Sequence, residues 1–270
     1  MTPDQPDTKL LQYIQGSNGI LRLTLNNPSQ RNALSEAMLE ALRDAFDWIS
    51  CNPNIRVVIL AAAGQVFCAG HDLREMTDGR QSADLGRAYF TKILKQCGSV
   101  MQQIVNCPKP VIAEINGVAT AAGCQLVASC DLAVAAKDAQ FCTPGVHIGL
   151  FCSTPMVALS RNVANKHAME MLLTGEMLPA SRAVEMGLIN QSVPAEDLAT
   201  TTMALAAKIA AKSSLTVATG KRAFYQQKEM DLEAAYTYAS EIMVENMLAI
   251  DAQEGIAAFF EKRAPEWKDG

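Results

Sequence analysis

The chain has 270 residues, of which 49% are hydrophobic and 19% are charged, and its formal net charge is −5. This composition supplies enough apolar material for one large domain, or for one domain with a smaller helical appendage. The acidic balance argues against a general nucleic-acid-binding protein, although a local basic patch for a phosphorylated ligand stays open.

The first two thirds of the chain alternate between strand-like and helix-like segments. Residues 20–25 alternate as in a strand, Ser35 precedes an amphipathic run, and residues 57–60 form a short apolar stretch. Further strands are expected at 111–115, 131–136 and 140–143, and further helices at 84–105 and 126–130. This alternation predicts an α/β fold with right-handed crossovers.

After residue 154 the pattern becomes mostly helical. Helices are expected at 156–161, 166–174, 181–186, 198–212, 216–228, 232–248 and 254–262. We therefore divide the chain into a core of residues 1–195 and a helical C-terminal region of residues 196–270, with a soft boundary near 190–200.

The eight cysteines form no CxxC pair, so their spacing indicates neither a metal site nor a disulfide framework. Most lie among apolar or small residues, which is typical of reduced thiols in a cytoplasm. Residues 1–9 are polar and acidic, unlike a signal or transit peptide. No apolar run approaches the ~20 residues of a membrane span. We expect a cytoplasmic protein that binds no metal, nucleic acid or membrane.

Residues 121–125, Ala-Ala-Gly-Cys-Gln, stand between the strand at 111–115 and the helical run at 126–130. A strand that leads into a helix start of small residues leaves backbone N–H groups unpaired and facing outward. Such a start suits a developing negative charge on an oxygen atom. Gln125 lies within the first helical turn, where a glutamate could move protons and an amide cannot.

A second candidate segment spans residues 65–73. The small residues Ala69 and Gly70 allow close approach of a backbone, and His71 and Asp72 follow directly. The segment is either an ordinary turn with a solvated histidine, or it supplies a second N–H donor from Ala69 with His71 as a polar site group. Two donors that converge from two loops form an oxyanion hole, which favours the second interpretation.

Six segments, in this order, resemble motifs of the crotonase superfamily, also called enoyl-CoA hydratase/isomerase: 28–35, 67–73, 115–131, 174–176, 183–188 and 254–265. The resemblance implies a crotonase (ClpP-like) spiral of ββα units with a C-terminal helical trimerisation region. It also implies a homotrimer, or a hexamer made of two trimers, that binds a coenzyme A thioester as substrate or ligand.

The same resemblance implies roles for individual residues. The N–H groups of Ala69 and Ala122 would hold the thioester oxygen. The positions implied for coenzyme A binding are Arg31, Ala33, Cys68, Ala69, Gly70, His71, Asp72, Leu73, Lys221 and Phe224. For Lys221 and Phe224, a solvated helical lysine and a core phenylalanine are equally open interpretations.

Both glutamates that hydratases of this family use are absent, and Gln125 and Gly145 stand at their positions. General acid–base catalysis is typically worth ~10²–10⁴-fold in rate, so we do not expect efficient hydration. Some decarboxylases of the family have a histidine in the same Ala-Gly-His-Asp sequence context as His71. His147 is either a proton shuttle or a packed side chain. Glu114, among apolar neighbours, is expected to be paired structurally.

Residues 120–131 and 143–155 resemble a narrower branch of the family that also lacks both glutamates. We predict an acyl-CoA-binding protein that stabilises a thioester enolate in an oxyanion hole, as a lyase or isomerase of fatty acid metabolism with an atypical active site. Two alternatives stay open: decarboxylase-like chemistry that uses His71, and a degenerate enzyme that binds acyl-CoA without turnover.

Overall fold

The computed structural model describes residues 4–270, so the first three of the polar residues 1–9 lie outside the described part. Within that part, six strands form one sheet in the order β1-β2-β3-β5-β7-β10, and four form a second in the order β4-β6-β8-β9. The strands are β1 Leu11–Gln15, β2 Ile20–Leu25, β3 Val57–Ala62, β4 Val66–Cys68, β5 Val111–Ile115, β6 Val118–Thr120, β7 Leu132–Ala136, β8 Gln140–Cys142, β9 Leu178–Pro179 and β10 Gln191–Val193.

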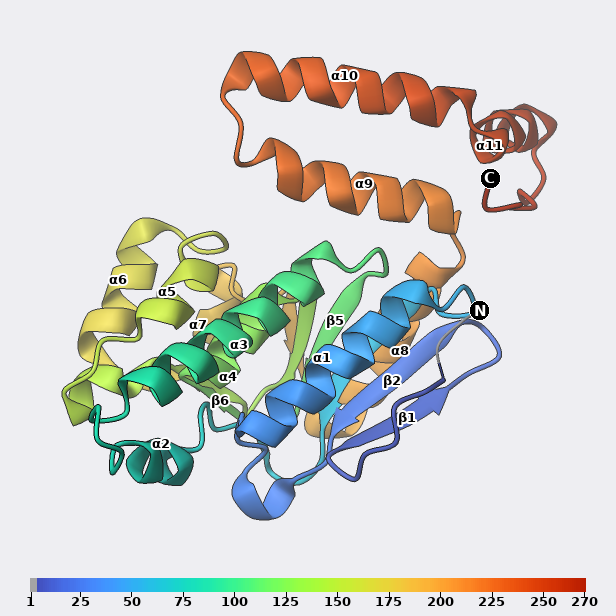
Figure 1. Ribbon diagram of the computed structural model, residues 1–270. Helices are drawn as coiled ribbons and strands as arrows, with labels where there is room; N and C mark the ends of the chain where they lie inside the picture. Colours follow the sequence, from blue (N-terminus) through green and yellow to red (C-terminus); the bar gives the residue numbers. More distant parts are fainter. Residues whose placement is uncertain (1–3) are drawn as a thin grey trace.

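Helices cover both faces of the first sheet, with α1 and α3 on one side and α8 on the other (Figure 1). The α-helices are α1 Glu36–Cys51, α2 Leu73–Gly79, α3 Arg87–Asn106, α4 Ala122–Ser129, α5 Ser153–Leu159, α6 Asn165–Thr174, α7 Ala180–Glu185, α8 Leu198–Ala210, α9 Ser214–Gln227, α10 Leu232–Leu248 and α11 Ile250–Glu261. Short 3₁₀ helices are η1 Pro28–Gln30, η2 Pro144–Ile148 and η3 Ala195–Asp197.

Successive units of the chain repeat one path. A strand enters the first sheet, the next strand enters the second sheet, and helices follow; the units begin at β3, β5 and β7. These strands pair in parallel within each sheet, as do β4, β6 and β8. The α/β alternation and the ββα spiral expected from the sequence are confirmed.

Sequence patterning explains the two apolar layers. Helix α1 begins after Ser35, whose hydroxyl accepts a hydrogen bond from Met38 N at 3.2 Å, and it buries an apolar face that includes Leu42 and Phe46 against the sheet. Strand β3 is almost wholly buried because helices cover both of its faces. On the opposite face, α8 packs Leu198 and Ala206 against apolar residues of the sheet.

The C-terminal helices differ in their relation to the core. Helix α8 lies on the first sheet, whereas α9, α10 and α11 extend beyond the sheets (Figure 1). The proposed region 196–270 therefore combines α8, which covers the sheet, with α9, α10 and α11, which do not. The division into 1–195 and 196–270 stays a prediction.

Candidate functional site

Two backbone segments meet at the candidate site, one after β4 and one at the start of α4. A Cβ atom on Gly123 would stand 2.2 Å from the carbonyl oxygen of Cys68. A Cβ atom on Gly70, whose φ is +85°, would stand 3.2 Å from the backbone nitrogen of Ala122. Because glycine has no Cβ, these two positions allow backbone to lie directly against backbone.

Ala121 forms the turn between β6 and α4 with φ 52° and ψ −118°, a region that alanine rarely adopts. Its N–H donates to the carbonyl of Cys142 at 2.9 Å, which holds the turn against β8. The first helical bond of α4 then runs from Gln125 N to Ala121 O at 3.1 Å. As a result the N–H of Ala122 has no acceptor within residues 4–270, as is usual in the first turn of a helix.

The structure corrects the expected second donor. The N–H of Ala69 donates to the carbonyl of Arg31 at 3.1 Å, so it is already used within the protein. The N–H of His71, in contrast, finds no acceptor among the described residues, while the neighbouring Gly70 carbonyl accepts from Leu34 N at 2.8 Å. The free donors on either side of the Gly70 contact therefore belong to His71 and Ala122.

The loop at residues 28–35 is responsible for this difference. The buried side chain of Asn32 accepts from Asn27 N and donates to the carbonyls of Ala63 and Val66, at 2.8–2.9 Å. This fixes the loop so that the Arg31 carbonyl reaches Ala69. The Arg31 side chain itself is exposed, and Ala33 is buried.

The side chains of His71 and Gln125 at this site have buried polar atoms without hydrogen-bond partners among the described residues. Both ring nitrogens of His71 are shielded from solvent, and no partner in residues 4–270 lies in hydrogen-bonding geometry. Burial lowers the pKa of the imidazole. The nearby backbone of Leu34, outside hydrogen-bonding geometry, only partly offsets this, so the ring is neutral at pH 7. Gln125 is 4% exposed, and its Oε1 is likewise buried without a described partner.

Gly145 has no room for the missing second glutamate. It is buried at the start of η2, and a Cβ atom there would stand 2.8 Å from the carbonyl oxygen of Leu150 and 2.9 Å from Cys152 Sγ. Leu150 N donates back to Gly145 O at 2.9 Å, which closes the turn. The turn has thus folded into the space where a side chain at 145 would begin.

Other residues expected at the site have structural partners. Asp72 caps α2, since its Oδ1 accepts from Arg74 N at 2.8 Å and Glu75 N at 3.4 Å. Leu73, the first residue of that helix, is exposed. Cys68 is completely buried, which raises the pKa of its thiol to about 12.

Lys221 is not free to meet a ligand in this structure. Its buried Nζ donates to Asp131 Oδ2 at 2.7 Å and to the carbonyls of Ile104 and Lys109 at 3.0 and 3.1 Å. Tyr225 OH donates to Asp131 Oδ1 at 3.0 Å, so two residues of α9 are fixed to the core through one carboxylate. Phe224 is exposed, contrary to a core role.

Glu114 is paired, and His147 is open to solvent. Glu114 forms a bidentate pair with Arg22 at 2.6 and 2.8 Å, which confirms its structural pairing. His147 is exposed, with its ring beside Gly175, so it is not packed beneath the loop.

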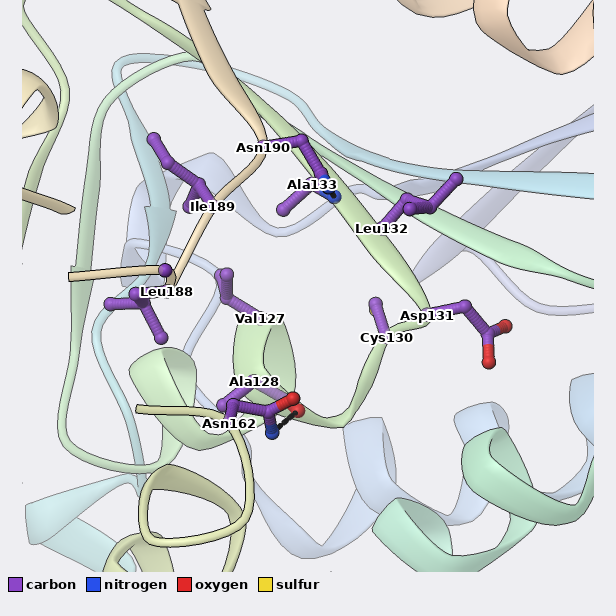
Figure 2. Close-up of a pocket in the computed structure, with 11 residues that line it drawn as sticks. Val127, Ala128, Cys130, Asp131, Leu132, Ala133, Asn162, Leu188, Ile189 and Asn190 are labelled. Carbon is purple, nitrogen blue, oxygen red and sulfur yellow. Dashed lines mark hydrogen bonds between the residues drawn. The ribbon is translucent and has the colours of Figure 1, made fainter. Parts of the chain in front are cut away.

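A cavity of about 70 Å³ lies at the C-terminal end of α4 (Figure 2). Its lining includes Val127, Asp131 and Asn190, and Asn162 Nδ2 donates to the Ala128 carbonyl at its edge at 2.7 Å. It has room for about two water molecules. None of the residues that surround the two free N–H groups lines it, so it is separate from the candidate site.

Residues 4–270 contain no cluster of three or more His, Cys, Asp or Glu side chains placed to hold a metal ion. Among the helices of this part, none is both long and apolar enough to span a bilayer.

Comparison with known proteins agrees with this architecture. The family model described as enoyl-CoA hydratase/isomerase matches residues 15–270. The mitochondrial enoyl-CoA hydratase domain-containing protein 3 of Mus musculus is 50% identical over 250 residues, which is 93% of this chain and 82% of that protein. The crystal structure of an enoyl-CoA hydratase from Mycobacterium smegmatis is 50% identical and has a TM-score of 0.92, with 96% of this chain and 98% of that chain covered.

The human enoyl-CoA hydratase domain-containing protein 3 has a crystal structure with a TM-score of 0.90 at 46% identity, covering 96% of this chain and all 100% of that one. The crotonase fold and the narrower branch indicated by residues 120–131 and 143–155 are thereby confirmed. The expected cytoplasmic location is contradicted, because the mouse, Xenopus laevis and human relatives of this branch are all named mitochondrial proteins.

Proposed function

The chain belongs to the enoyl-CoA hydratase/isomerase family, and on this premise we propose that it binds an acyl-CoA thioester. The thioester oxygen accepts hydrogen bonds from the N–H groups of His71 and Ala122. One observation carries this proposal: both N–H groups lack a described protein acceptor, whereas the N–H of Ala69 already donates to Arg31.

The chemistry that such a site supports is stabilisation of an enolate. When a bond at the carbon next to the thioester breaks heterolytically, its electron pair moves toward the carbonyl oxygen. Donors fixed in advance stabilise that charge, and a single donor of this kind is worth about 10²–10³-fold in rate. The close contacts at Gly70 and Gly123 hold both donors in place without further reorganisation.

Ordinary hydration is not part of the proposal. Gln125 supplies an amide and Gly145 supplies no side chain, so neither position can hold or deliver a proton as a carboxylate does. An acyl-CoA whose reaction needs no carboxylate base fits the site better.

The neutral, unpartnered imidazole of His71 favours decarboxylation as a second candidate. A carboxylate on the carbon next to the thioester leaves as CO₂, and the electrons of the broken C–C bond form the enolate. That carbon then takes a proton from water, either directly or through the His71 ring, which gives up its N–H proton and regains one from water. The mechanism consumes one proton and requires no other reagent.

Coenzyme A contacts and assembly belong to the same proposal. The exposed Arg31 side chain is the candidate for a phosphate of coenzyme A, and the Arg31 carbonyl accepts from the N–H of Ala69 in the 68–73 segment. The exposed apolar residues of α10 and α11 would be covered in a homotrimer or a hexamer.

The test combines calorimetry with mass spectrometry on butyryl-, crotonyl- and methylmalonyl-CoA. Release of CO₂ from methylmalonyl-CoA without hydration of crotonyl-CoA supports enolate chemistry, and binding without product supports a degenerate binder. A Gly70→Ala variant should lose acyl-CoA affinity, because its new Cβ would press on Ala122 N. Gly98→Ala, with nothing within 4 Å of its Cβ position, is the matched control.

A further inference from the structure

The segment of residues 264–270 lies against the joint between α8 and α9, which is formed by residues 211–213. Beyond this joint, α9, α10 and α11 form an arm that extends away from the sheets (Figure 1). We propose that residues 264–270 are a clasp, which holds the joint to the core and so keeps the start of the arm in place. This proposal is independent of the acyl-CoA site.

Arg56 connects the clasp to the core. It directly precedes β3, and its backbone N–H donates to the Gly19 carbonyl at 2.8 Å, so its position is fixed by the core. Its guanidinium donates to Asp269 Oδ2 at 2.7 Å and to the carbonyls of Ala210 and Lys212 at 2.8 and 2.6 Å. The last carbonyls of a helix need such partners outside the helix, and hydrogen bonds from a charged donor are the stronger kind.

The clasp also bonds to the backbone on both sides of the joint. Asp269 Oδ1 accepts from Ser214 N at 2.6 Å, and this is one of the first N–H groups of α9, which have no acceptor within the helix. A carboxylate at this end is also favoured by the helix dipole. Trp267 Nε1 donates to the carbonyl of Ala211 at 2.8 Å. The joint is therefore held by two side chains of the clasp.

Helix α11 supports the clasp from the arm. The carboxylate of Asp251, which is only 2% exposed, accepts from Lys268 N at 2.7 Å and from Asp269 N at 3.0 Å. These bonds fix the backbone that carries the Asp269 side chain. Because Asp251 belongs to the arm and Arg56 to the core, the clasp spans the two parts.

The second half of α9 has anchors of its own. Lys221 and Tyr225 bind Asp131, and Lys228 Nζ donates to the carbonyl of Arg161 at 2.8 Å. The clasp holds the first residue of α9, about 10 Å along the helix axis from Lys221. Attachment at both places holds the helix along its length, whereas loss of the clasp leaves its start free to swing away from the core.

Limited trypsin digestion can test this, because Lys212 lies in the joint with an exposed side chain while Arg56 binds its carbonyl. Cleavage after Lys212 requires the joint to open, so its rate follows the population of the open form. Mass spectrometry counts the fragment 213–270, whose mass shows that the clasp was whole when the joint was cut. The double variant Trp267→Phe, Asp269→Asn removes the indole donor and the charge, and it should be cut there about tenfold faster than wild type.

Glu266→Gln is the matched control in the same segment. It removes a charge whose carboxylate is 82% exposed and lies 3.9 Å from Lys268 Nζ. This variant should keep the wild-type rate of cleavage after Lys212. A double variant that is cut no faster than wild type, or a Glu266→Gln variant that is cut equally fast, overturns the clasp.

Tyr225→Phe tests whether the clasp and the second anchor hold one rigid helix. It removes the hydrogen bond to Asp131 and should leave the rate unchanged on its own, because the clasp still holds the joint. Combined with the double variant, it should speed cleavage about threefold further. The same effect in both backgrounds would mean that the joint opens independently of the arm, and it overturns the proposal. Thermal melting checks folding, and Trp267→Phe alone replaces the double variant if that one does not fold. Acyl-CoA is absent from the assay, so its outcome leaves the proposed function untouched.

Discussion

Cys152 Sγ lies 2.9 Å from the position that a Cβ atom on Gly145 would occupy. The backbone carbonyl of Leu150 stands equally close at 2.8 Å and cannot rotate away as a side chain could. Gly145→Ala should therefore lower the free energy of unfolding by about 1–3 kcal/mol, because overpacking forces the backbone to shift. Urea denaturation measures this.

Gly98→Ala serves as the control for that substitution, because nothing lies within 4 Å of its Cβ position on α3. It should raise stability by about 0.5–1 kcal/mol. The same crowding predicts that Gln125→Glu combined with Gly145→Glu gains no hydration of crotonyl-CoA. A stable, hydrating double variant would show that the turn at 145–152 opens easily.

Backbone strain at Ala121 gives a second prediction. Its φ of 52° with ψ of −118° suits glycine, whereas Ala122 is helical. Ala121→Gly should raise the free energy of unfolding by about 1 kcal/mol, since relief of strain exceeds the entropic cost of glycine. Ala122→Gly, its neighbour, should lower it by about 0.5–1 kcal/mol. Equal losses in both variants would mean that the turn is not strained.

Much of the fold follows from periodicity in the sequence. The strands at 20–25 and 111–115 and the helix at 232–248 begin and end as predicted. The strands β4 and β6 were not predicted, because three residues are too few to show an alternating pattern. Helix 84–105 starts later, at Arg87, because Leu85 and Gly86 have left-handed φ values of 57° and 88°. The Asp84 carboxylate accepts from Ala88 N at 2.8 Å in the first turn.

The site was predicted less completely than the fold. Small residues at 69–70 and 121–123 correctly marked two backbones that approach each other. The sequence could not show which N–H stays free, because that depends on the Arg31 carbonyl, 38 positions before Ala69 along the chain. Nor could the sequence show that Asp131, in another segment, forms an ion pair with Lys221, so that Lys221 is not available to bind a ligand. Long-range hydrogen bonds leave no local pattern.

The buried imidazole of His71 predicts a pH dependence of stability. Burial lowers its pKa below the ordinary value of 6.5. As the pH falls through that value, the unfolded chain takes up a proton that the folded protein does not, so stability decreases with falling pH. Between pH 7.5 and 5, wild-type protein should lose more unfolding free energy than His71→Asn. A larger loss in His71→Asn would contradict the buried, neutral ring.

The ion pair between Lys221 and Asp131 predicts how α9 is held. The two side chains are only 7% and 15% exposed. Lys221→Met leaves a buried carboxylate without its cation and should cost about 3–5 kcal/mol, with faster proteolysis at residues 211–213 as α9 loosens. Arg43→Met, which removes an exposed pair with Glu40, should cost less than about 1 kcal/mol. Adding Asp131→Asn to Lys221→Met should recover part of the loss.

The exposed apolar side chains of α10 and α11 predict self-association. Leu232, Phe259 and Phe260 are each at least 75% exposed in the single chain. Patches of this kind usually mark an interface between proteins. Sedimentation velocity should show an oligomer for the wild-type protein and a smaller species for the double variant Phe259→Ser, Phe260→Ser. Ile14→Ser, which removes an exposed apolar residue of β1, should leave the oligomer unchanged. A monomeric wild-type protein would contradict assembly through these helices, and an unchanged double variant would place the interface elsewhere on the chain.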